Sequence, residues 1–552
     1  MTGKQKLELT WIGKETRPRL EPRILLEDPE KSHHAPHRVT ENDLFDNRLI
    51  FGDNLLALKA LEQEFAGKIK CIYIDPPFNT GQAFEFYDDG IAHSLWLSLM
   101  RDRLIELRQL LSFDGSIWVH CNDSEQAYLK IVMDEIFGRD NFVTTFIWQK
   151  VDSPNDNKVP ITPDHDYILC YSRNSKAPKF KPKQDMNLLD AYKTDPITGR
   201  LFRDRLLKKN GKNSLRKDRP SMFFPITDPD GNDVFPIHDD GQEARWAYGQ
   251  KAVKEMIENN ELIWKQRVLA GHRRWVPYTR EFAPASPSRP YPTIWTDVLT
   301  TRQAKIHQSD LLPELPQFDT PKPEQLIARI LEIATEKNDF VLDSFGGSGT
   351  TGAVAHKMGR RWIMVELGEH CQTHIIPRLK KVIDGEDPGG ITKAVEWKGG
   401  GGFRYFRLAP SLLEKDKWGN CVINQKFNAA MLAEALCKLE GFTYAPSDQV
   451  YWQHGYSTER DYIFVTTQRL TPDQLQQLSE EVGPEQTLLV LCAAFRGNSD
   501  QFPNLTVKKI PKYICNRCEW GHDDYSLKIE NLPKAPPKKG QQSLFDLEGG
   551  DQ

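Results

Sequence analysis

The strongest constraint on the fold is a glycine-rich turn between an apolar run and a helical pattern. The apolar run 340–342 leads into Asp343-Ser-Phe-Gly-Gly-Ser-Gly-Thr-Thr-Gly352, and a helical pattern follows. A second apolar run, 362–365, then ends at Glu366. Strand, glycine turn, helix, strand and acid in this order are typical of a βαβ unit that binds a nucleotide. The glycines let the backbone approach the ligand, and the acid can accept hydrogen bonds from two ribose hydroxyls.

A second feature lies some 270 residues earlier in the chain, where an apolar run ends in Asp75-Pro76-Pro77-Phe78. Proline has no backbone donor and a fixed φ, so this turn is stiff and presents carbonyl acceptors. A carboxylate, a carbonyl and an aromatic ring within four residues can hold an exocyclic amine and stack on the base that carries it. A nicotinamide dehydrogenase would share the glycine turn, but it would leave this second motif unexplained.

Together the two motifs resemble the S-adenosylmethionine-dependent DNA amino-methyltransferases. The amine-binding motif comes first, a long insert follows and the cofactor motif comes last, which is the permuted order of the β group. That group includes the modification (Mod) subunits of type III restriction-modification systems. The resemblance implies an α/β fold: a doubly wound, mostly parallel sheet like that of Rossmann proteins, an inserted target-recognition domain and a smaller C-terminal α/β domain.

The resemblance also implies the site residues and their roles. Asp75, Pro76, Pro77 and Phe78 would hold and stack on the target base, and Asp53 would contact the adenine of the cofactor. The segment around Lys322 would close over the methionine end of the cofactor. The full set of expected cofactor-binding residues is Asp53, Asp75, Lys322, Pro323, Asp343, Phe345, Gly347, Ser348, Gly349, Thr350 and Glu366.

Composition shifts along the chain predict six segments. We expect an N-terminal arm at 1–40, the catalytic half of the methyltransferase domain at 41–172 and a DNA-binding insert at 173–310. The S-adenosylmethionine-binding half follows at 311–410, then a C-terminal domain at 411–532 and a disordered tail at 533–552 rich in Pro, Lys, Gly and Gln.

The insert carries the charge expected of a nucleic-acid partner, although the whole chain has a net charge of −4. Residues 173–219 hold fifteen Lys/Arg against five Asp/Glu, and a second cluster near residue 273 mixes cations with aromatics. Such patches neutralise phosphates. A basic run can also be only a solvated surface, but this one lies where the family reads its target. The expected DNA-binding residues are Lys179, Lys181, Lys183, Lys208, Lys209, Lys212, Arg216, Arg273 and Arg274.

Other features of the sequence argue against a membrane protein, a secreted protein, a disulfide-rich protein and a metal-binding protein. No apolar run approaches the eighteen residues of a membrane span, and residues 1–8 lack the apolar core of a signal peptide, so we expect a cytoplasmic protein. Nine scattered cysteines do not suggest a disulfide framework. Cys515 and Cys518 with His522 have no second ligand pair nearby, so no metal site is predicted.

The reaction expected from these motifs is site-specific methylation of adenine N6 in duplex DNA, within a restriction-modification system. Asp at the first motif position favours adenine in this family, and the alternatives are N4-cytosine methylation and a non-catalytic DNA-recognition subunit. The resemblance implies a homodimer and a restriction (helicase or nuclease) subunit as partner. The stretch from Gln541 to Leu547, Gln-Gln-Ser-Leu-Phe-Asp-Leu, resembles peptides that dock on the replication sliding clamp.

Overall fold

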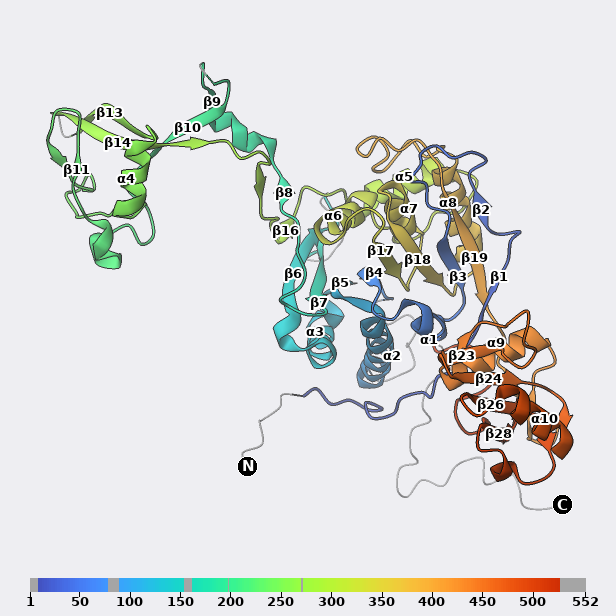
Figure 1. The fold of residues 1–552 in the computed structure, drawn as a ribbon. Coiled ribbons are helices and arrows are strands. Elements are labelled where there is room, and N and C mark those ends of the chain that lie inside the picture. The colour runs from blue at the N-terminus through green and yellow to red at the C-terminus, as the bar shows by residue number, and fades with distance from the viewer. Residues whose placement is uncertain (1–7, 78–88, 153–160, 197, 270–271, 527–552) are drawn as a thin grey trace, which may run out of the picture. The chain divides into compact units, whose positions relative to one another are not determined.

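The computed structural model describes residues 8–77, 89–152, 161–196, 198–269 and 272–526. The chain divides into two compact units (Figure 1). The first combines Met1–Lys181 with Pro292–Gln552, and the second is Pro182–Tyr291. The first unit is therefore built from two stretches of chain that flank the second.

Within the described residues, the first unit contains an eleven-stranded sheet. Its strands are parallel from β19 to β5, and β7 is antiparallel to both of its neighbours. In spatial order they are β1 (Leu25–Glu27), β19 (Gly402–Leu408), β3 (Asn47–Phe51), β18 (Arg361–Glu366), β17 (Phe340–Asp343), β4 (Ile69–Ile74), β5 (Leu111–Cys121), β7 (His165–Ser172), β6 (Phe142–Gln149) and β16 (Ile294–Trp295), with β2 (His33–His34) paired to β19.

Helices cover both faces of this sheet. Figure 1 shows α1 (Asn54–Phe65), α2 (Asp89–Leu110) and α3 (Asp123–Phe137) on one face. The other face carries α5 (Thr301–Leu311), α6 (Glu324–Ala334), α7 (Thr350–Lys357) and α8 (Ile376–Ile383). The central strands are almost wholly buried, as expected for parallel strands with helices on both sides. The predicted doubly wound, mostly parallel α/β fold is confirmed.

The sheet reverses its winding between β17 and β4. From β17 the chain passes through α7 to β18 on one side, whereas from β4 it passes through α2 to β5 on the other side. In open α/β sheets ligands bind at such a switch point, outside the carboxyl ends of the strands. Asp343 ends β17 and Asp75 directly follows β4, so the fold brings the two sequence motifs together at this point.

The second unit is shorter at both ends than the predicted insert 173–310. Residues 173–181 and 292–310 belong to the first unit, where β16 pairs with β6 and the Lys181 amide donates to the Ile333 carbonyl. The second unit has a small core around Leu207 and Trp246. Its elements are a sheet of β13 (Leu262–Leu269), β14 (His272–Phe282), β10 (Leu201–Leu206) and β9 (Lys193–Thr194), helix α4 (Gln250–Glu258), and the short pairs β11 (Ile226–Thr227) with β12 (Asp233–Val234) and β8 (Lys183–Gln184) with β15 (Ser288–Arg289).

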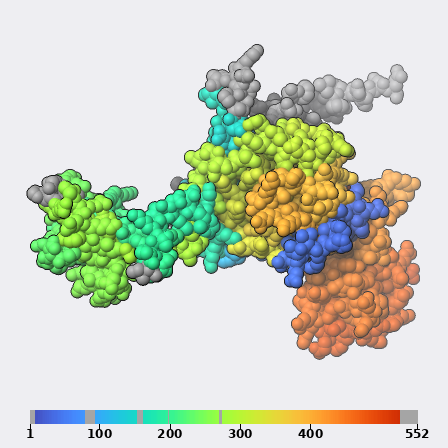
Figure 2. All heavy atoms as spheres, turned by 90° about the horizontal axis from the view of Figure 1, so that it is seen from above, coloured from blue at the N-terminus to red at the C-terminus, as the bar shows by residue number. Residues whose placement is uncertain are grey.

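The N-terminal stretch is not a free arm where the structure describes it. β1 and β2 pair with β19, and Figure 2 shows this blue segment against the orange surface of the later chain. Local polarity gave no indication of this pairing, because edge strands need only one partner and few apolar residues.

The C-terminal region has its own five-stranded sheet and apolar clusters. The sheet order is β22 (Thr443–Tyr444), β23 (Gly455–Thr458), β24 (Asp461–Val465), β26 (Thr487–Cys492) and β28 (Leu505–Lys509). Around it lie α9 (Ala429–Glu440), α10 (Pro472–Val482), β20 (Leu413–Lys415) with β21 (Cys421–Ile423), and β25 (Arg469–Leu470) with β27 (Ala494–Phe495).

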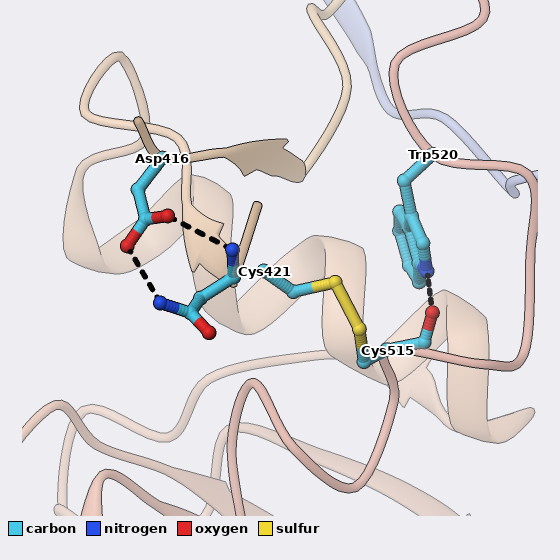
Figure 3. Close-up of a disulfide and its surroundings, with 5 residues drawn as sticks. Asp416, Cys421, Cys515 and Trp520 are labelled. Carbon is cyan, nitrogen blue, oxygen red and sulfur yellow. Dashed lines mark hydrogen bonds between the residues drawn. A yellow bond between two sulfur atoms is a disulfide. The ribbon is translucent and has the colours of Figure 1, made fainter. Parts of the chain in front are cut away.

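One disulfide ties this region together, although the sequence suggested no disulfide framework. Cys421 and Cys515 are bonded, with their Cα atoms 6.2 Å apart (Figure 3). The Trp520 indole donates to the Cys515 carbonyl beside it. Cys515 is therefore no thiol ligand for a metal with Cys518, which is a buried free cysteine.

Within the described part of the chain, no helix combines the length and apolar character needed to cross a membrane.

Candidate active site

A cavity of about 390 Å³ opens at the carboxyl ends of the central strands of the first unit. Most of the predicted site residues line it: Asp53, Asp75, Pro76, Pro77, Lys322, Asp343, Phe345, Gly347, Ser348, Thr350 and Glu366. Pro323 and Gly349 do not line it; they are the N-cap residues of α6 and α7. Phe78 lies outside the described residues. The fold thus gathers residues from four strand ends around one hollow.

The glycine turn forms one wall of the cavity and needs its glycines for conformation and space. Gly347 and Gly349 have φ angles of 52° and 78°, which favour glycine. A Cβ on Gly349 would also stand 3.1 Å from Ile375. The Gly347 amide donates to Glu366 Oε2 at 2.8 Å, so the acid at the end of β18 helps to hold the turn. The other Glu366 oxygen accepts from the Gly368 amide at 2.8 Å.

Asp343 lies at the base of the cavity and is almost fully buried. Its carboxylate accepts from the Phe345 amide at 2.9 Å and from the Thr351 hydroxyl at 2.5 Å. Burial, together with the nearby carboxylates of Asp75 and Glu366, raises the pKa of Asp343 to about 8 despite these donors. The group is therefore mostly protonated at pH 7 in the absence of a cationic neighbour.

Asp75 and Lys322 form the polar pair at the opposite side of the switch point. The Lys322 ammonium, 9% exposed, donates to Asp75 Oδ2. The Thr350 hydroxyl donates to the Lys322 carbonyl at 3.2 Å, which fixes this segment to the start of α7. Asp75 Oδ1 is buried and accepts no hydrogen bond from any described residue. A buried carboxylate oxygen without a donor is costly, so it marks a position where a ligand donor would bind.

Asp53 lines the cavity, but protein donors already occupy its oxygens. Oδ1 caps α1 by accepting from the amides of Leu55 and Leu56 at 2.9 and 3.1 Å. Oδ2 accepts from the Tyr525 amide at 2.9 Å and lies 3.4 Å from the Arg103 guanidinium. The predicted direct contact between Asp53 and the cofactor adenine would have to compete with these partners.

Several lining residues were not predicted from the sequence. Tyr73 comes from β4, and its hydroxyl lies 3.2 Å from His120 Nδ1. His120 Nε2 in turn lies 3.0 Å from Asp166, which also pairs with Lys150 at 2.8 Å. An alternating strand pattern indicates that Tyr73 faces one side of the sheet, but it does not show that the residue reaches a cavity. Phe318 and Thr320 also line the cavity and belong to the segment 318–323 that was expected to close over the cofactor. The lining residues outside the predicted set are Asn54, Leu99, Arg103, Ile327, Ser344, Gly346, Thr351, Leu367, His370 and Ser526.

The predicted DNA-binding cations are divided between the two units. Lys179 and Lys181 belong to the first unit, where Lys181 pairs with Glu336 at 2.6 Å. Over Pro182–Tyr291 there are twenty Lys/Arg and fifteen Asp/Glu, a net charge of +5, because acids later in the insert dilute the basic run. The predicted cations that lie in the second unit are Lys183, Lys208, Lys209, Lys212, Arg216, Arg273 and Arg274.

Some of these cations form ion pairs with acids, and others lie next to another cation. Lys208 pairs with Asp239 at 3.2 Å and Arg216 with Glu243 at 2.9 Å. Lys208, Arg273 and Arg274 line a cavity of about 870 Å³ within the second unit. Arg274 is exposed and lies directly opposite the exposed Arg267 in the β13–β14 ladder. Like charges directly opposite each other destabilise a sheet. Carboxylates line the same cavity and offset part of this charge: Asp228, Asp230, Asp233, Asp239 and Asp240.

Comparisons with known proteins agree with the geometry. The family model described as DNA methylase matches residues 69–376. The probable type III restriction-modification enzyme HindVI Mod subunit of Haemophilus influenzae is 32% identical over 66% of this chain and 54% of its own length. The type II methyltransferase M.KpnI of Klebsiella pneumoniae is 29% identical over 57% of this chain and 77% of its own. The chain thus spans about half the length of the HindVI subunit.

Among solved structures, PvuII DNA methyltransferase (cytosine-N4-specific) is 14% identical over 66% of this chain and 95% of its own, with a TM-score of 0.35. The family model is the stronger finding, because it covers more than half of the chain and includes both motifs and the segment between them. The chain belongs to the DNA methylase family.

Proposed function

We propose that the protein transfers a methyl group from S-adenosylmethionine to N6 of a flipped-out adenine in duplex DNA. The observation that carries the proposal is the open acceptor of Asp75 in the same cavity as the glycine turn. The amine of the target base, bound by Asp75, and the cofactor, bound by the glycine turn, would therefore lie next to each other in one cavity. Asp at the first position of the motif supports adenine over cytosine, by the resemblance to the family.

The residues of the cavity fit S-adenosylmethionine. The glycine turn leaves room for a ligand beside its backbone. Each carboxylate oxygen of Glu366, at the end of β18, accepts one backbone amide and has a second lone pair that can accept a ribose hydroxyl. The neutral form of Asp343 avoids leaving an unpaired charge at the base of the cavity. When bound, S-adenosylmethionine supplies a methyl group on a sulfonium, which is a good leaving group.

The chain's own task is to prepare the adenine amine. The N6 lone pair is delocalised into the ring, so the amine is a weak nucleophile. Asp75 Oδ1 accepts one amine hydrogen and the Pro76 carbonyl accepts the other, which draws the nitrogen toward tetrahedral geometry. Lys322 holds the Asp75 carboxylate in place by binding its other oxygen. Orientation and charge stabilisation then supply most of the rate, and the proton leaves after transfer.

The second unit is proposed to bind the DNA. An amine inside a duplex is out of reach, so the target base must leave the stack. Phe78, which lies outside the described residues, would stack on the flipped base. The exposed Arg267 and Arg274 are proposed to share a phosphate, since an anion relieves their repulsion.

The proposal extends to the protein's partners. By resemblance to the type III group, the protein would act in the cytoplasm as the modification subunit of a restriction-modification system, as a homodimer with a restriction subunit. The Mod name of the HindVI relative supports this class of partner. The clamp-like peptide from Gln541 to Leu547 lies outside the described residues and stays a proposal from the sequence.

The test is an isosteric substitution, Asp75→Asn, in the full chain. It replaces one oxygen of the Asp75 carboxylate with an NH2 group and removes the negative charge. We expect methyl transfer to fall by about a thousandfold. Binding of S-adenosylmethionine should change only a few-fold, because the glycine turn and Glu366 are untouched. Asp114→Asn is the matched control, since Asp114 is exposed and lies in β5 next to the amino-terminal start of β4, away from the cavity.

The assay combines methylation of DNA from a methylation-free host with mass spectrometry of the nucleosides. N6-methyladenine from the wild type and from Asp114→Asn, but not from Asp75→Asn, is the expected result. N4-methylcytosine in place of N6-methyladenine would assign the other base. Transfer by Asp75→Asn at the wild-type rate would refute the mechanism.

A further inference from the structure

Residues 523–526, here called the C-terminal strap, leave the C-terminal region and reach the cavity of the methyltransferase sheet. The contacts are made by the backbone: the Tyr525 amide donates to Asp53 Oδ2 at 2.9 Å, and the Tyr525 carbonyl accepts from Arg103 Nη2 at 3.1 Å. Ser526 lines the 390 Å³ cavity directly. A segment more than 420 residues from Arg103 in sequence therefore forms part of this wall.

We propose that the C-terminal strap is a built part of the cofactor site and that S-adenosylmethionine binds tightly only when the strap is seated. This inference rests on the proposed function, because it concerns the cofactor of that reaction. It assigns a binding role to a segment outside both sequence motifs, and it makes cofactor affinity depend on the C-terminal region.

The strap contacts two buried charges. Asp53 is 1% exposed and Arg103 is 2% exposed. Their separation of 3.4 Å is long for a charged hydrogen bond, and the contact that each makes with the Tyr525 backbone is shorter than this separation. Removing the strap would take one hydrogen bond from each of these buried charges, although each keeps other partners within the sheet domain. Losing a hydrogen bond at a buried charged group is costly. Water would have to enter this wall to solvate them.

The same charges connect the strap to the glycine turn. Arg103 Nε donates to Asn54 Oδ1, and Asn54 Nδ2 donates to the Ser344 carbonyl at 2.7 Å. Ser344 directly follows Asp343 at the start of the turn. Two side chains therefore connect the Tyr525 carbonyl to the turn that would hold the cofactor. Losing the strap should loosen that connection as well as open the wall.

The strap is also held at its N-terminal end, where it leaves the C-terminal region. Arg23 Nη2 donates to Asp523 Oδ1 at 2.6 Å and to the His522 carbonyl at 3.2 Å. The Tyr525 hydroxyl donates to Glu519 at 3.2 Å, and its ring makes an edge contact with His522 at 4.2 Å. These contacts pre-order the segment, so little conformational entropy remains to be lost when the cofactor binds.

The experiment compares two substitutions at one position in the full chain. Tyr525→Pro removes the backbone donor to Asp53, because proline has no N–H, whereas Tyr525→Ala keeps it. Affinity for S-adenosylmethionine is measured by isothermal titration calorimetry, and folding is checked by circular dichroism. We expect Tyr525→Pro to weaken binding at least about tenfold, the loss of one charge-assisted hydrogen bond. Tyr525→Ala should weaken it by much less.

A pair of truncations provides a second test if the proline variant does not fold. A chain ending at Gly521 lacks the strap, and a chain ending at Ser526 keeps it. The shorter chain should bind S-adenosylmethionine at least about tenfold more weakly than the longer one. Equal affinity in either pair would overturn the inference, as would tighter binding without the strap, which would mean that the strap competes with the cofactor. Failure of the wild type to bind S-adenosylmethionine would instead refute the proposed function.

Discussion

Replacing Asp343 with asparagine should stabilise the folded protein, and the gain should grow with pH. Burial raises the pKa of Asp343 from 3.8 to about 8 in the fold. Between these values the folded protein holds a proton that the unfolded chain has lost. Wild-type stability therefore falls as the pH rises through this window. Asparagine is neutral at every pH and has the same shape. Its amide donates to the Thr351 hydroxyl, and its oxygen accepts from the Phe345 amide.

The magnitude follows from the two pKa values. Each pKa unit corresponds to about 1.4 kcal/mol, so the cost to the wild type is about 2 kcal/mol at pH 5, about 4 kcal/mol at pH 7 and about 6 kcal/mol above pH 8. The difference in unfolding free energy between Asp343→Asn and wild type should thus increase by about 4 kcal/mol from pH 5 to pH 9. Any constant offset from the altered hydrogen bonds cancels in this comparison.

The assay is urea denaturation of both proteins at pH 5, 6, 7, 8 and 9. Tryptophan fluorescence reports on the eleven-stranded sheet that contains Asp343, because Trp118, Trp148 and Trp362 are buried in its strands. Thr351→Val serves as a control, since it removes a donor that lowers the pKa of Asp343 and should extend the fall in stability to higher pH. A difference between Asp343→Asn and wild type that stays level from pH 5 to pH 9 would refute the reasoning.

Two further predictions concern catalysis and DNA binding. Lys322→Met removes the cation that orients Asp75, and single-turnover methylation should slow by about ten- to a hundredfold; an unchanged rate would show that Asp75 needs no such support. Replacing both Arg267 and Arg274 with alanine should weaken DNA binding and reduce the slope of log affinity against log salt by about 1, since the two side chains share one phosphate; fluorescence anisotropy measures both. An unchanged slope would mean that these side chains do not contact phosphates.

Contiguous motifs explain why much of the site was predictable. The glycine turn, its flanking strands and Glu366 lie within one βαβ unit, so their relative placement follows from local geometry. The order of the two motifs also indicated that the sheet is assembled from separated stretches of chain. Asp343 ends β17 and Asp75 follows β4, and these parallel strands end at the same edge, so the two carboxylates line one cavity.

Other features depended on partners that are remote in sequence. The segment after residue 291 returns to the first unit through β16, which has only two residues and gives no period to detect. The net positive charge of the run 173–219 is higher than that of the folded second unit, because Lys208 and Arg216 form ion pairs with acids that come later in the chain. Charge counted along a sequence window therefore overstates the charge that a folded surface presents.

Asp53 shows how tertiary partners decide what a local motif can do. An aspartate after a strand and before a helix presents two acceptor oxygens at the ligand edge of a sheet, which favours a ligand contact. The helix that it precedes takes one oxygen as its cap, and this much is local. The other oxygen is taken by the Tyr525 backbone, which no pattern near residue 53 could indicate. Asp75 Oδ1 keeps its acceptor open because the described chain brings no donor to it, and this difference in tertiary environment separates a carboxylate held by protein donors from one with an acceptor to spare.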